Sequence, residues 1–144
     1  MRLVKYFKTL KMMFRSLSHI VDMEEVGDLE PFYSRFRANV PDSANSSTLD
    51  LGCGGIPRNP FKAELLYGID IRDSANPNIS RSDLAQEGIP HGDASMDYIT
   101  AFDFIEHIPR VVYLPQIRYS FIELMNEVYR VLTPSGIFLA QTPV

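Results

Sequence analysis

A glycine-rich turn and an acidic residue further along the chain are the clearest chemical signal in this sequence. Gly52 and Gly54 follow the apolar run 48–51, and Asp70 closes a second apolar run at 66–69. Glycine lets the backbone turn sharply and lets a ligand lie directly against the main chain, since no β-carbon stands in the way. A carboxylate that ends the next strand is the arrangement by which α/β folds bind the two hydroxyls of an adenosine ribose. Together the two features predict an adenosine-containing ligand.

The residues after the glycines indicate which adenosine compound fits. Dinucleotide sites place a pyrophosphate on backbone N–H groups at a helix N-terminus and use the pattern G-x-G-x-x-G. Here Pro57 stands at the third glycine position and Pro60 follows, so two backbone donors are missing where a phosphate would need them. S-adenosylmethionine has no phosphate and carries an adenine, a ribose and a zwitterionic amino-acid tail. The sequence favours S-adenosylmethionine, and the alternative is a nucleotide-binding oxidoreductase that uses a nicotinamide dinucleotide.

Other polar residues have both a chemical and a structural interpretation. His107, with Glu106 beside it, is a natural general base near neutral pH, but it could equally pack under the adenosine site. Asp50 could contact the cofactor or cap the turn by accepting bonds from backbone N–H groups. Cys53 is the one cysteine and is expected to act as a small filler, because no histidine stands in register with it. The scattered histidines and single cysteine give no metal-ligand spacing, and His91 is expected at the surface.

These residues lie at the ends of predicted strands. Short apolar runs alternate with helical patterns after residue 48, as expected for strands and crossovers of a mostly parallel sheet. In open α/β sheets ligands bind outside the carboxyl ends of the strands, so the candidate residues should share one rim. The predicted strands are 48–51, 66–69, 78–80, 98–102 and 137–141, and the clearest predicted helix is 116–132.

The 144-residue chain has the composition of one folded domain with a separate N-terminal extension. A hydrophobic content of 45% excludes a wholly disordered chain, and a net charge of -4 gives no global basic field for nucleic acid. Residues 1–19 hold five basic residues and no acidic one, and apolar residues recur at helical spacing from 3 to 21. We expect this amphipathic helix to pack on the domain, with an anionic membrane as the less favoured partner of residues 1–21. The polar stretch 41–47 divides an extension at 1–45 from a domain at 46–144.

Signals for export or membrane insertion are missing from the sequence. No apolar run approaches the length of a membrane span, and the N-terminus lacks the apolar core and cleavage site of a signal peptide. A single cysteine fits a reducing compartment. We therefore expect a cytoplasmic protein, whose oligomeric state the sequence does not indicate.

Five motifs stand in order along the chain: Asp50-Leu51-Gly52-Cys53-Gly54, Ile69-Asp70, Asp83-Leu84, the run 97–107 and the run 127–136. Together they resemble the motifs of class I S-adenosylmethionine-dependent methyltransferases with a methyltransferase type 11-like domain. The resemblance implies an α/β fold with a Rossmann-like, mostly parallel sheet. It also implies transfer of a methyl group to an oxygen or nitrogen of a small-molecule or glycan acceptor.

The resemblance also implies roles for individual residues. The methionine end of the cofactor would lie on Asp50, Gly52, Cys53 and Gly54; the ribose on Asp70; the adenine on Ile71, Asp83 and Leu84; and the methyl group beside Phe102 and Asp103. His107 and Asp103 are the candidate bases, and a base is needed only for a hydroxyl acceptor.

Two departures from the family pattern stand out. Ile56 stands where the loop of this family, as distinct from the dinucleotide pattern, has its third glycine. The crossover 54–65 is also short and contains two prolines, so its helix should be vestigial or replaced by a loop. The chain also stops after the predicted strand 137–141, whereas the family fold continues through two more strands. A fragment or a reduced variant is expected, and a non-catalytic adenosine-binding or interaction module is the alternative if the natural chain ends at Val144.

Overall fold

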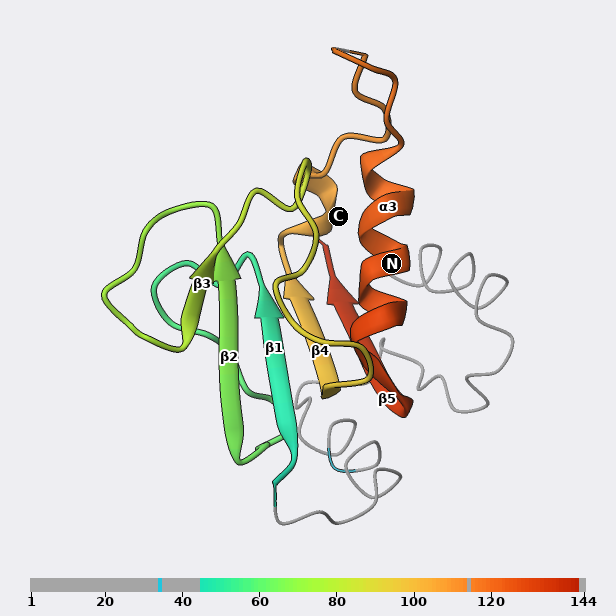
Figure 1. Ribbon diagram of the computed structural model, residues 1–144. Coiled ribbons are helices and arrows are strands. Elements are labelled where there is room, and N and C mark those ends of the chain that lie inside the picture. The colour runs from blue at the N-terminus through green and yellow to red at the C-terminus, as the bar shows by residue number, and fades with distance from the viewer. Residues whose placement is uncertain (1–33, 35–44, 114, 143–144) are drawn as a thin grey trace, which may run out of the picture.

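The computed structural model describes residues 34, 45–113 and 115–142 and forms one parallel sheet (Figure 1). The strand order is β3-β2-β1-β4-β5, and every pairing is parallel. The strands are β1 (Ser47–Leu51), β2 (Leu65–Asp70), β3 (Ile79–Arg81), β4 (Met96–Phe102) and β5 (Leu132–Gln141), and the helices are the 3-10 turn η2 (Ile105–His107) and α3 (Ser120–Val131). All five predicted strands and the predicted α/β fold are confirmed. The order reverses between β1 and β4, which is the switch point where such sheets bind ligands.

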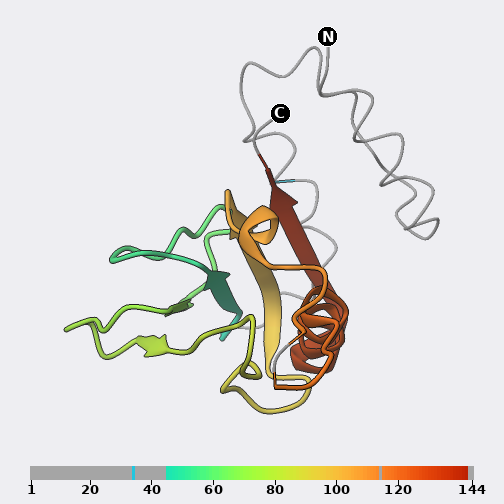
Figure 2. The same ribbon diagram turned by 90° about the horizontal axis from the view of Figure 1, so that it is seen from above.

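The two faces of the sheet are covered by different segments. Leu49 and Leu51 of β1 pack in the larger core with α3 and the crossover 82–95, because alternate residues of a strand point to opposite faces. On the other face, Phe61 from the loop after β1 stacks on Tyr98, with ring centroids 4.4 Å apart. Figure 2, seen from above, shows α3 on one side of the sheet and the β1–β2 crossover on the other.

The crossover from β1 to β2 contains no helix within the described residues, as its prolines predicted. Pro57 is buried against Gly68 of β2, where a β-carbon would meet the proline ring. Asn59 closes the loop because its side chain accepts a bond from the Ala63 N–H and donates one to the Ala63 carbonyl. This crossover therefore covers its face of the sheet as a loop and not as a helix.

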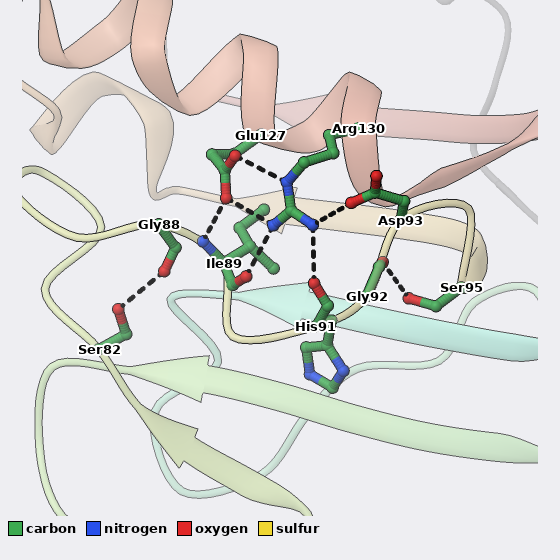
Figure 3. Close-up of polar contacts among 9 residues, drawn as sticks. All are labelled: Ser82, Gly88, Ile89, His91, Gly92, Asp93, Ser95, Glu127 and Arg130. Carbon is green, nitrogen blue, oxygen red and sulfur yellow. Dashed lines mark hydrogen bonds and ion pairs between the residues drawn. The ribbon is translucent and has the colours of Figure 1, made fainter.

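The crossover from β3 to β4 also lacks a helix in the described chain, and an ion pair on α3 holds it (Figure 3). Glu127 accepts a 2.9 Å bond from the Ile89 N–H, and Arg130 donates bonds to the carbonyls of Ile89 and His91 and to Asp93. Arg130 and Glu127 are themselves joined at 2.6 Å. The pair ties the crossover to the amphipathic helix that covers the same face.

Two sequence expectations need correction. The predicted helix 116–132 begins four residues later, because Val112 and Arg118 exchange two backbone hydrogen bonds in an antiparallel bridge outside it. His91, expected at the surface, is half-buried, and its ring lies 5.5 Å from that of Tyr67. It sits there because Arg130 holds its backbone carbonyl.

The predicted amphipathic helix at 3–21 lies outside the described residues. Within the described part of the chain, no helix has the length and hydropathy needed to cross a membrane.

Candidate functional site

The carboxyl ends of β1, β2 and β4 meet at one rim, at the arrowheads in Figure 1. Gly52 and Gly54 both have positive φ, at +66° and +64°, a conformation that favours glycine. Between them, the Cys53 N–H bonds the Ile69 carbonyl of the neighbouring strand at 3.1 Å. The turn is therefore pinned to β2 at the point where Asp70 ends that strand.

Asp70 is almost fully buried at this rim and accepts three bonds. One oxygen accepts the Gly54 N–H at 2.8 Å, and the other accepts the backbone N–H and the Nε of Arg72, both at 3.0 Å. Burial raises the pKa of Asp70, but the hydrogen bonds from Arg72 and Gly54 outweigh it, so this pKa lies below its ordinary value. The carboxylate is ionised and in position to accept further hydrogen bonds.

The structure fits an adenosine ribose at Asp70. The Arg72 side chain that shares its carboxylate is 75% exposed, so it can turn into solvent and leave the carboxylate to a ligand. Two ribose hydroxyls could replace this side chain while the backbone bonds from Gly54 and Arg72 remain. Ile71, next in sequence, is also exposed and offers an apolar surface for the adenine. A β-carbon on Gly55 would meet nothing within 4 Å, so the turn leaves open space beside it.

Asp50 is fully buried under the turn. Its carboxylate accepts the Thr100 hydroxyl at 2.7 Å and the Arg58 backbone N–H at 2.8 Å. Burial is the main influence on Asp50 and raises its pKa, against the hydrogen bonds that lower it. These contacts give Asp50 the turn-capping role, and its contact with a cofactor stays a prediction.

Sequence reasoning missed Arg58. Its guanidinium lies 4.4 Å from the centre of the Phe102 ring, donates to the Phe102 carbonyl at 2.8 Å, and places Nε 3.7 Å from Asp50. The loop after β1 thus brings a cation to the end of β4. The sequence offered one signal for Arg58, which is its position as a basic residue in a crossover too short for a helix.

The other expected cofactor residues differ in placement. Cys53 is buried, and burial, with the nearby carboxylates, raises the pKa of its thiol to about 11, which fits a filler and not a nucleophile. Leu84 packs in the larger core, and the Asp83 side chain caps its own turn by accepting the Ala85 N–H. Phe102 is buried at the rim.

The two candidate bases follow β4 directly. Asp103 is exposed and has a φ of +51°, while its N–H bonds the Gln141 carbonyl of β5. Such a conformation is costly for most residues and is tolerated best by asparagine and aspartate. The His107 side chain is 75% exposed, with Nε2 4.0 Å from Glu106. Both side chains are accessible to an acceptor, and no cluster of metal-ligating side chains occurs in the described residues.

Comparison with known proteins gives a family and a fold. A family model described as a methyltransferase domain matches residues 49–140. A SAM-dependent methyltransferase from Archaeoglobus fulgidus is 20% identical, with a TM-score of 0.51, and the alignment covers 96% of this chain and 58% of that one. An S-adenosylmethionine-dependent methyltransferase from Clostridium acetobutylicum is 15% identical, with a TM-score of 0.51 and coverage of 93% and 55%. The chain thus spans little more than half of these structures, and no curated protein matches it.

Proposed function

The chain belongs to the methyltransferase domain family, as its ordered motifs predicted, and we propose that it transfers a methyl group from S-adenosylmethionine. S-adenosylmethionine is the cofactor of this family. The observation that carries the proposal is the buried Asp70 beside the positive-φ glycine turn. That pair provides a hydroxyl acceptor and a close backbone approach but no row of amide donors for a pyrophosphate. This arrangement gives the nicotinamide alternative no support.

Methyl transfer needs little covalent catalysis from the protein. The sulfonium methyl is already activated, so an acceptor oxygen or nitrogen can attack it in line. The chain's task is to hold donor and acceptor at about 3 to 3.5 Å with the correct orientation, which can lower the barrier by several kcal/mol. The glycine turn, which is bonded to β2, and the end of β4 would provide that alignment.

We propose an oxygen or nitrogen of a small molecule or glycan as the acceptor. A hydroxyl acceptor must lose a proton, and the exposed His107 and Asp103 after β4 are the groups that could take it. A nitrogen acceptor with a free lone pair needs no such base.

We propose that the extension at 1–45 packs on the domain at 46–144. We also propose that the protein is cytoplasmic.

Ligand-induced stabilisation tests the proposed function directly. S-adenosylhomocysteine should raise the melting temperature, because a ligand that binds only the folded state stabilises it by mass action. NADH at the same concentration should leave the melting temperature unchanged. A shift with NADH and none with millimolar S-adenosylhomocysteine would reject the proposal.

A further inference from the structure

We propose that Arg58 binds the carboxylate of the amino-acid tail of S-adenosylmethionine. The inference rests on the proposed function and deepens it, because it assigns a residue that the sequence motifs do not include. Arg58 lies in the loop after β1, and its guanidinium reaches the end of β4 at the Phe102 carbonyl. It therefore stands between the two strands that flank the switch point.

The shortened crossover creates a need for this cation. A helix N-terminus after a glycine turn carries a partial positive charge and free N–H groups, and both favour an anion. Within the described residues no helix lies between the turn and β2, and Pro57 and Pro60 supply no N–H donors. A carboxylate at this position requires another source of positive charge. The guanidinium of Arg58 carries a full positive charge.

Arg58 has donors left for a ligand. Nη2 donates to the Phe102 carbonyl and Nε faces Asp50 at 3.7 Å, while Nη1 makes no hydrogen bond to any residue the structure describes. The Arg58 side chain is 47% exposed, so a ligand can approach it. Guanidinium and carboxylate form strong charge-assisted hydrogen bonds. The neighbouring cation on the rim, Arg72, is paired with Asp70 instead.

Phe102 and Asp50 hold the guanidinium in place. The ring of Phe102 lies under its central carbon at 4.4 Å, a distance at which cation–π attraction operates. Asp50 is fully buried and lies 3.7 Å from Nε, so its carboxylate helps to orient the guanidinium of Arg58. A side chain fixed in this way loses little conformational freedom when it binds an anion.

Two ligands separate tail binding from loop positioning. S-adenosylhomocysteine has the amino-acid tail, whereas 5′-methylthioadenosine keeps the adenine, ribose and sulfur but lacks the tail. Calorimetric titration of Arg58→Met should show affinity for S-adenosylhomocysteine reduced roughly 10- to 100-fold, the effect of losing one charge-assisted bond. Affinity for 5′-methylthioadenosine should stay within about threefold, a difference below 1 kcal/mol. Arg58→Lys should recover part of the lost affinity.

Controls make each outcome decisive. The backbone N–H that bonds Asp50 remains in every Arg58 variant, and melting without ligand checks that the variants fold. Arg110→Met, at an exposed arginine beyond η2, should bind both ligands as the wild type does. Unchanged affinity of Arg58→Met for S-adenosylhomocysteine, or an equal loss for both ligands, would overturn the inference while the proposed function stood. A wild type that binds neither ligand would overturn both.

Discussion

The ring of Phe104 fills the position that a β-carbon on Gly52 would take. Gly52 belongs to the turn after β1, and Phe104 belongs to the segment that leads from β4 into η2. The missing side chain of Gly52 therefore allows the two sides of the switch point to pack together, in addition to leaving room for a ligand. Its positive φ adds a second requirement for glycine at the same residue.

Gly52→Ala should destabilise the domain more than Gly55→Ala does. The first variant is strained at φ +66° and overlaps the Phe104 ring, and each effect costs about 1 to 3 kcal/mol. The second meets nothing within 4 Å and should change the free energy of unfolding by at most about 0.5 kcal/mol. Urea unfolding measures both. In a Phe104→Ala background the cost of Gly52→Ala should fall, and an undiminished cost would contradict the contact.

Asp70→Ala should weaken binding of S-adenosylhomocysteine by roughly 10- to 100-fold, because it removes a charge-assisted acceptor of the ribose hydroxyls. His107→Ala should keep the affinity within about threefold, since a base that acts on the acceptor contributes to methyl transfer and not to donor binding. Calorimetric titration measures both.

Asp73→Ala is the matched control for Asp70→Ala. Its side chain is almost fully exposed three residues further along the chain, so the variant should bind as the wild type does. Equal affinity of the wild type and Asp70→Ala would refute the ribose assignment. A large loss in His107→Ala would instead make that histidine part of the adenosine site.

Arg72→Met should bind S-adenosylhomocysteine as tightly as the wild type or up to about fivefold more tightly. The arginine side chain competes with the ribose for one oxygen of Asp70, and because this arginine is 75% exposed, solvent screening limits the pair to about 1 kcal/mol. Calorimetric titration again decides. A tenfold loss of affinity would mean that Arg72 binds the cofactor and does not compete with it.

Sequence patterns predicted the strands and the glycine turn because both are encoded locally. Apolar runs of strand length, glycines and a closing aspartate are visible within a few residues of one another. The crossover contacts were missed because they join distant residues. Arg58 meets Phe102 44 positions later, and Arg130 bonds the Ile89 carbonyl 41 positions earlier. No periodicity marks such pairs, and Arg130 resembles any charged residue on a helix.

Arg130→Met should lower the free energy of unfolding by roughly 1 to 3 kcal/mol, since several hydrogen bonds to the β3–β4 crossover are lost together (Figure 3). Arg81→Met removes an exposed pair with Asp73 and one exposed hydrogen bond to the Ile71 carbonyl, and it should cost less than about 1 kcal/mol. Urea unfolding compares them. Equal costs would show that the Arg130 network contributes no more than a surface ion pair.

Stability should fall as the pH is lowered below about 6.5, in part because of His91. Burial lowers the pKa of this histidine from its ordinary 6.5, and its Nε2 is buried without a hydrogen-bond partner in the described structure. The unfolded chain therefore binds a proton at a pH where the folded domain does not. The contribution is fully present above pH 6.5 and is lost as the pH falls through the folded-state pKa.

His91→Phe isolates this histidine from the other titrating groups. Phenylalanine keeps a ring against Tyr67 and leaves the backbone carbonyl that Arg130 holds, but it cannot take up a proton. Urea unfolding from about pH 7.5 to 5.5 brackets the ordinary histidine pKa and should give a shallower decline for the variant. Because both proteins share every other acid and base, the difference between the two slopes reports His91 alone. Parallel slopes would mean that His91 gains a proton as readily in the folded domain as in the unfolded chain.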